Sequence, residues 1–165
     1  MVDYKRIWYS VIESINNPST NLLTAGTNPA NLLGGSDGPG FGWDDINIIK
    51  VGAEWRATPK LTIRGGYAYN EVPFSSRDLE VNILAPGIVR QHFTAGLKYE
   101  LSDSWDLELA GFYAPKETIE GGELGIPTPL GPIGNPNHRI EIQGQGGEVT
   151  LGFTYRFGAI KAGLK

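Results

Sequence analysis

Apolar and polar side chains alternate without a break near the end of the chain, from Val149 to Phe157. Residues 149, 151, 153, 155 and 157 are all aliphatic or aromatic, and the residues between them are Thr, Gly, Thr and Arg. Because successive side chains of a β-strand point to opposite faces, this stretch predicts a strand with one apolar face and one polar face. Such a strand lies either on the core of a soluble protein or in a membrane barrel, between lipid and a wet lumen.

Five other stretches show the same alternation, so the chain predicts six strands in all. Most approach the roughly 9–11 residues that a tilted strand needs to cross a bilayer, whereas strands of globular proteins average about 5–6 residues. Strand length therefore favours a membrane protein. The expected strands are 2–12 (in which Arg6 interrupts either face), 46–57, 61–70, 91–101, 105–113, and a last one that contains 149–157 and can begin as early as Ile140.

The connections between the expected strands alternate strictly between short and long. Thr58-Pro59-Lys60 and Ser102-Asp103-Ser104 make short turns, and the other links span about 13–45, 71–90 and 114–139. Transmembrane barrels combine short periplasmic turns with long outer loops in this way. A soluble β-sandwich can show the same pattern by chance and stays an alternative.

Composition narrows the class of protein. The chain has 165 residues, enough for one domain, and no apolar run approaches the ~20 residues of a spanning helix. Cysteine is absent, which excludes disulfides and thiolate sites. The net charge of -4 without a basic cluster argues against nucleic acid as a partner. Residues 1–6 lack the apolar core of a signal peptide, and we expect that the N-terminal part of a longer chain is missing.

No catalytic or cofactor-binding motif stands out. The only histidines are His92 and His138, and no serine stands at a recognisable spacing from either. The glycine-rich stretch 34–40 lacks the Lys-Ser/Thr end of a phosphate-binding loop. We therefore expect no enzyme activity, no cofactor and no metal site.

Charged side chains fall on the polar faces of the expected strands, with both signs on neighbouring strands. In a lumen these groups stay hydrated or pair across strands, whereas an Arg or Lys that faces lipid near the bilayer centre would cost ~2–4 kcal/mol. The solvent face of a soluble sheet would carry the same residues. The set is Lys50, Glu54, Arg56, Arg64, Lys98, Glu100, Asp106, Glu108 and Arg156.

Large apolar residues in unusual places are candidates for ligand contact. Phe112 is the one large apolar residue that we place on a polar face, and Leu124, Ile126 and Leu130 lie in the last long link. Loop packing is the alternative for each loop residue. Aromatic residues gather near the strand ends on the apolar faces, as they do at membrane interfaces, although core packing is again the alternative. They are Trp55, Tyr67, Tyr69, Tyr99, Trp105 and Tyr113.

Several runs resemble a known family in their order and spacing. They are GFGWDD (40–45), IIKVGAEW (48–55), LTIRGGY (61–67), Pro73, NILAPG (82–87), HFTAGL (92–97) and YRF (155–157). Together they resemble outer-membrane long-chain fatty-acid transporters of the FadL/TodX type, from about Asp3 to Phe157. That family has a fourteen-stranded barrel, plugged by an N-terminal hatch, which passes fatty acids or aromatic hydrocarbons passively into the bacterial outer membrane.

The resemblance implies an all-β antiparallel meander of about six long strands, the C-terminal part of a transmembrane β-barrel. Residues 1–157 would form the barrel segment, and 158–165 an extension that departs from the family pattern. Implied partners are a long-chain fatty acid or another hydrophobic small molecule, outer-membrane lipid, the missing N-terminal strands and hatch, and the barrel-assembly machinery, which would recognise Phe153, Tyr155 and Phe157. A small membrane-barrel anchor or adhesin and a soluble β-sandwich binding module remain alternatives.

Overall fold

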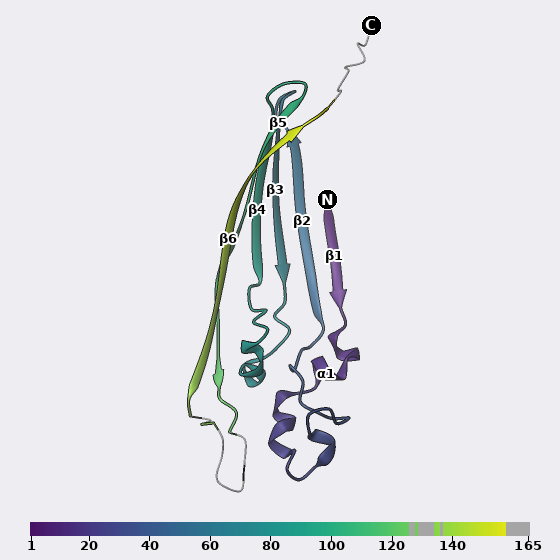
Figure 1. Cartoon of the computed structure of the whole chain (residues 1–165), viewed down its shortest axis with the longest axis vertical. Coiled ribbons are helices and arrows are strands. Elements are labelled where there is room, and N and C mark those ends of the chain that lie inside the picture. The colour runs from purple at the N-terminus through teal and green to yellow at the C-terminus, as the bar shows by residue number, and fades with distance from the viewer. Residues whose placement is uncertain (126–127, 129–133, 136, 158–165) are drawn as a thin grey trace.

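The computed structural model describes residues 1–125, 128, 134–135 and 137–157. Its six strands form one antiparallel sheet in the order β1-β2-β3-β4-β5-β6, so each strand pairs with its neighbours in sequence (Figure 1). This confirms the predicted all-β meander. The strands are β1 (Val2–Ile7), β2 (Ile46–Arg56), β3 (Leu61–Asn70), β4 (Gln91–Glu100), β5 (Trp105–Gly122) and β6 (Arg139–Tyr155).

Short helical elements lie in the long links at one end of the sheet, which we call the loop end. The short connections between strands lie at the other end, which we call the turn end (Figure 1). No helix in the described part of the chain is both long and apolar enough to cross a membrane. The helical elements are η1 (Tyr9–Val11), α1 (Glu13–Asn16), η2 (Ser19–Thr24), η3 (Pro29–Asn31), η4 (Ser76–Asp78) and η5 (Val81–Ile83).

The first strand is shorter than its sequence predicts. The ladder between β1 and β2 ends at the pair Ile7 and Ile46, and the expected continuation to Ile12 is wrong. Asp45 turns the chain away from the ladder after Ile7. Its carboxylate accepts a hydrogen bond from the Ser10 amide (3.0 Å) and forms an ion pair with Arg6 (3.4 Å). The Ser10 amide, with a smaller contribution from Arg6, lowers the pKa of Asp45 below its usual value.

The last hairpin is longer than its sequence predicts. The expected end of the fifth strand near Tyr113 is wrong, because β5 continues to Gly122 and shortens the link; β6 begins at Arg139, within one residue of the earliest start expected. Proline ends most strands, but Pro115 lies in a β-bulge. Ala114 pairs with Gly146 and Glu117 with Gly144, so Pro115 and Lys116 together oppose Gln145. A bulge tolerates a residue without an amide hydrogen, and the strand goes on beyond it.

The sheet has two chemically different faces along the part of each strand between the turn end and this bulge. The apolar face carries residues such as Trp55, Ile63, Leu97, Leu109 and Leu151, which lie opposite one another from strand to strand in the ladder. The polar face carries the intervening residues, Glu54, Arg64, Lys98, Glu108 and Thr150 among them.

Nothing in the described part of the chain covers the apolar face. Val51 is 43% exposed and Phe153 is 61% exposed, and all six strands belong to the single sheet (Figure 1). A soluble sandwich needs a second sheet over this face to form its core. The described structure therefore does not have the architecture of a β-sandwich.

The buried hydrophobic core lies at the loop end instead. Phe74, Leu79 and Ile88, from the link between β3 and β4, are buried together. Trp43 and Val72 pack against them from the loops, and Ile119, Ile140 and Ile142 from the last hairpin. We call the segments 9–45 and 71–90 the cap.

Candidate functional site

The polar face carries cross-strand ion pairs near the turn end. Arg64 on β3 donates from its Nε to Glu54 Oε2 on β2 at 2.7 Å. On the next strands, Lys98 lies directly opposite Glu108. The ladder thus brings several of the predicted charged residues together on one face; that this face encloses a lumen stays a prediction.

Asp106 is the centre of a second group of charges on that face. Its carboxylate is 1% exposed and accepts from Lys98 Nζ at 2.9 Å. Arg156, just beyond β6, donates two further hydrogen bonds to it, at 2.6 and 2.8 Å. Two parallel hydrogen bonds to a guanidinium fix geometry as well as charge. This contact ties the end of β6 to β5, and the sequence pattern did not single out Asp106 as its centre.

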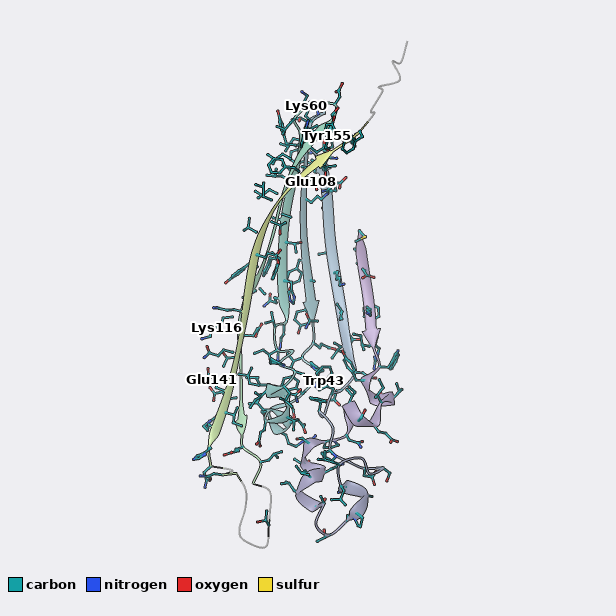
Figure 2. The ribbon with its side chains drawn as sticks, in the orientation of Figure 1. Trp43, Lys60, Glu108, Lys116, Glu141 and Tyr155 are labelled. Atoms are coloured by element: carbon teal, nitrogen blue, oxygen red, sulfur yellow. The ribbon has the colours of Figure 1, made fainter. Side chains whose placement is uncertain are left out.

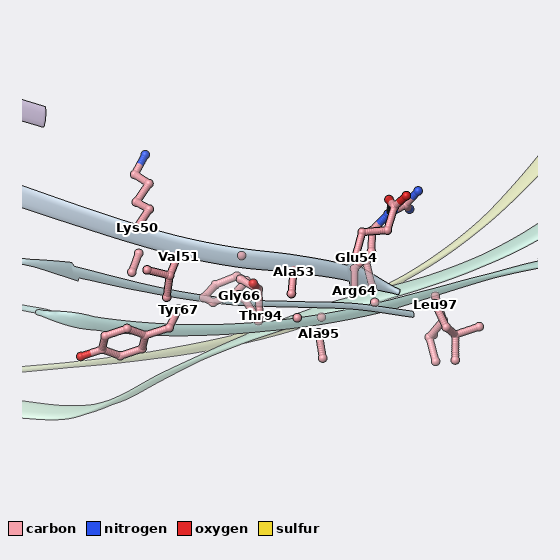
Figure 3. Close-up of a pocket in the computed structure, with 18 of the residues that line it drawn as sticks. Lys50, Val51, Ala53, Glu54, Arg64, Gly66, Tyr67, Thr94, Ala95 and Leu97 are labelled. Atoms are coloured by element: carbon pink, nitrogen blue, oxygen red, sulfur yellow. Dashed lines mark hydrogen bonds and ion pairs between the residues drawn. The ribbon is translucent and has the colours of Figure 1, made fainter. Parts of the chain in front are cut away.

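A trough runs along the polar face between these charges and the loop end. It has a cavity volume of about 1080 Å³. Its floor is made of small residues on successive strands, Gly52, Gly66, Gly96 and Ala110. Figure 3 shows Glu54 and Arg64 together on one side of the sheet, while Tyr67, Ala95 and Leu97 point to the other.

Phe112 is the large aromatic residue that borders this trough. The ladder places it on the polar face, opposite Thr94 on β4 and Glu148 on β6. The prediction that it is the one large apolar residue on that face is wrong, because Ile46 and Ile48 of β2 share the face near the loop end. Those two isoleucines belong to the part of the strand that approaches the cap.

The two faces exchange their character beyond the bulge. β6 continues without a register shift of its own, so Gly144, Ile142 and Ile140 lie on the same face as Gly146 and Glu148. There, Ile119 and Ile142 pack on the cap core. The opposite face, apolar below the bulge, now carries Thr118 opposite Gln143 and Glu120 opposite Glu141, and Arg139 pairs with Glu120 at 2.8 Å.

The apolar face is therefore a band with two borders. On β5 it runs from Trp105 to Tyr113, about 27 Å of strand at ~3.4 Å per residue. Aromatic side chains lie near both borders. Trp55, Tyr99, Trp105 and Tyr155 lie toward the turn end, and Tyr67, Tyr69, Phe93 and Tyr113 toward the loop end. Figure 2 marks the two ends of the sheet with Tyr155 and Lys60 at one and Lys116 and Glu141 toward the other.

The predicted assembly signal lies at the turn-end border. The Tyr155 ring packs at a tilt against Trp105 with a centroid distance of 4.8 Å and meets Phe157 edge-on at 4.5 Å. Phe153 precedes them on the same face. Recognition of these residues by assembly machinery stays a prediction, and the extension 158–165 lies outside the described residues.

Two of the predicted ligand-contact residues, Ile126 and Leu130, also lie outside the described residues. Leu124 is half-buried, and its amide donates to Glu80 Oε2 of the cap at 2.5 Å. This contact packs the loop around Leu124 against the cap. It does not place Leu124 at the trough.

Buried polar contacts join the two cap segments. Asp78 Oδ1 accepts from the amide and hydroxyl of Ser19 at 2.9 and 2.8 Å. Asn82 donates to Phe41 O at 2.8 Å and accepts from Trp43 Nε1 at 2.5 Å. Gly42 passes beside Asp78 with a φ of +65°. The run GFGWDD therefore serves to close the cap.

The described residues hold no group of three or more His, Asp or Glu side chains that could bind a metal ion. Of the two histidines, His138 contacts Glu123 at 3.2 Å. His92 lies on β4 opposite Ala68.

Comparison with known proteins returns limited matches. No family model and no curated protein matches the chain. Two solved structures align with it: the P. putida toluene transporter TodX (17% identity, TM-score 0.45) and a deltaS2 mutant of the TodX monoaromatic hydrocarbon channel (18% identity, TM-score 0.45). The alignments cover 69% and 68% of this chain but only 22% and 23% of those chains, respectively, so the chain spans less than a quarter of their length.

Proposed function

We propose that this chain forms part of the wall of a bacterial outer-membrane β-barrel that passes hydrophobic small molecules across the membrane without catalysis. The observation that carries the proposal is the exchange of faces at the Pro115–Lys116 bulge. A bilayer has a finite thickness. The lipid-facing surface of a spanning strand is therefore expected to be apolar inside the bilayer and polar beyond it.

The free edges of the sheet support the barrel. Among the described strands, β1 and β6 each have only one partner. Unpaired backbone groups in hydrocarbon cost several kcal/mol each, so spanning sheets close on themselves. We propose that further strands, from the same polypeptide, pair with both edges.

The trough supports a hydrophobic cargo. Its glycine floor lets a ligand approach the backbone closely, and Phe112 supplies an apolar wall beside the charged residues of the trough. The sequence resemblance adds long-chain fatty acids as the first cargo to test.

Fractionation and binding test this proposal together. Expressed with an export signal and together with the further strands that are proposed to pair with its edges, the protein should sediment with outer membranes and resist extraction by carbonate. In detergent it should bind radiolabelled palmitate or toluene, and Phe112→Ala should weaken that binding. A monodisperse protein without detergent would contradict the membrane location. An inserted protein that binds neither ligand would favour the anchor alternative.

A further inference from the structure

The two segments of the cap leave the sheet in different places. The first cap segment, 9–45, joins the ends of β1 and β2, and the second cap segment, 71–90, joins the ends of β3 and β4 (Figure 1). Each is held by contacts of a different chemical kind, and this difference decides which of them can move.

The second cap segment is fastened to the last hairpin by apolar packing. Its buried residues Phe74, Leu79 and Ile88 pack against three isoleucines of β5 and β6. The hairpin backbone also comes close, because a Cβ at Gly121 would overlap Leu79 and one at Gly144 would overlap Ile88. Separating these surfaces would expose apolar side chains to water, which is costly.

The first cap segment is folded on itself. The Ile15 carbonyl accepts hydrogen bonds from the amides of Phe41 and Trp43, which joins the beginning of the segment to its end. At its neck, Asp45 accepts a hydrogen bond from the Ser10 amide. The segment is therefore one body on a stem formed by β1 and β2.

The seam between the two cap segments is mostly polar. Ser19 donates twice to Asp78, and Asn82 bonds the first segment twice, once through the indole of Trp43. Among the described residues, Trp43 alone brings the first cap segment to the apolar core.

A polar seam separates more easily than an apolar one. Water replaces the hydrogen bonds when the seam opens, so each contributes only modestly to holding it closed. Apolar surface finds no such replacement in water. Local opening takes place at the least stable junction of a structure, and in this cap that junction is the seam.

We propose that the first cap segment is a hinged lid, which swings off the second cap segment about the stem of β1 and β2. The second cap segment stays on the last hairpin. The cap core lies on the face that continues the trough beyond the bulge, so this movement uncovers the loop end of the trough. The movement follows from the contacts alone, whereas its role in admitting hydrophobic cargo rests on the proposed function.

Cysteine labelling tests the movement in the complete barrel, with the further strands present. Ser19 and Leu79 are both fully buried, one in the seam and the other in the apolar core. A water-soluble maleimide should label Ser19→Cys at least about tenfold faster than Leu79→Cys, because only the seam opens locally. Leu79→Cys leaves a cavity, which biases the comparison against this expectation. Equal rates, or faster labelling of Leu79→Cys, would overturn the lid.

Hydrogen-bond variants locate the opening at the seam. Trp43→Phe removes the indole donor to Asn82 and should speed the labelling of Ser19→Cys about fivefold, the value of one hydrogen bond. Asn21→Ala is the matched control, since it removes a hydrogen bond to Asp37 O within the first cap segment. It should leave the rate unchanged. Equal effects of the two variants, or no effect of Trp43→Phe, would overturn the assignment of the opening to the seam.

A cross-link tests what the lid does. Ser19→Cys with Asp78→Cys places two sulfurs where Ser19 Oγ and Asp78 Oδ1 lie 2.8 Å apart. Oxidation should reduce the uptake of radiolabelled palmitate or toluene to background, and a reductant should restore it in the same protein. Ser19→Cys alone, treated with the same oxidant, is the control and should keep its uptake.

The outcomes separate the lid from the proposed function. Undiminished uptake through the cross-linked protein would overturn the role of the lid and leave the proposed function standing. If the reduced protein and the control took up neither ligand, the proposed function would fail, and the maleimide rates would still decide whether the lid opens.

Discussion

Single residues set the geometry of the cap and of the strand ends. Gly42 adopts a left-handed backbone, and a Cβ at this position would overlap the Asp78 carboxylate. Asp106 gathers Lys98 and Arg156 at the turn end. The sequence pattern predicted that charged residues share a face, but not which of them pair, because pairing depends on the stagger between strands and on rotamers.

Replacing Gly42 by Ala should loosen the cap by about 1–3 kcal/mol, because a left-handed backbone and a steric overlap are imposed together. Hydrogen-exchange protection of the Ser19 and Asn82 amides measures this loss. Gly26→Ala is the control, since Gly26 has no positive φ and no neighbour within 4 Å. Equal hydrogen-exchange protection in Gly42→Ala and Gly26→Ala would show that the Asp78 carboxylate does not restrict the side chain at position 42.

Replacing Asp106 by Asn should lower the thermal stability of the folded protein, because Lys98 and Arg156 lose the charge that they share. Arg156→Lys should have a smaller effect in the same direction, since an ammonium keeps the charge but loses the bidentate geometry. Heat-dependent mobility on gels measures both. An unchanged transition in Asp106→Asn would show that the end of β6 is held by the ladder alone.

At the scale of elements, β2, β3 and β4 could be predicted to within a residue, because each alternates cleanly between two turn signals. The extent of β5 could not. Its apolar residues change face at Pro115, so the alternation breaks while the strand continues. The end of β1 was missed for another reason: long-range contacts of Asp45 decide it.

The bulge makes a sharp prediction about deletions. Removing Pro115 alone leaves one residue opposite Gln145, so Glu117 still pairs with Gly144 and Ile119 still faces the cap. Removing Pro115 and Lys116 together shifts the alternation and turns Ile119 to the other face. We expect protease resistance of the hairpin to survive the single deletion and to be lost in the double one. Similar resistance in both would mean that the cap core does not hold the hairpin.

The described part of the molecule is a one-layer sheet whose packed core lies at one end (Figure 1). Such an arrangement is unstable in water, because the apolar band between the two aromatic borders stays uncovered. In a bilayer, lipid chains would cover the same band. The sequence could predict the faces, since they follow from alternation, but not the position of the cap core, which joins segments far apart in the chain.

Arginine substitutions in the middle of the sheet distinguish its two faces. Leu151→Arg would place a charge on the apolar face and should destabilise the membrane-inserted protein by about 2–4 kcal/mol. Its neighbour Thr150 lies on the polar face, and Thr150→Arg should cost far less. Urea titration of the protein in lipid vesicles measures both. Equal costs would contradict the assignment of the faces.

The most direct test of the membrane account is a single-cysteine scan along β6, which is clean because the chain has no cysteine. Spin labels at 149, 151 and 153 should be accessible to oxygen in the bilayer, and labels at 148, 150 and 152 to a water-soluble nickel reagent. Beyond the bulge, labels at 141 and 143 should meet water although they continue the apolar face. Water accessibility at every position, or lipid contact that continues past the bulge, would contradict it.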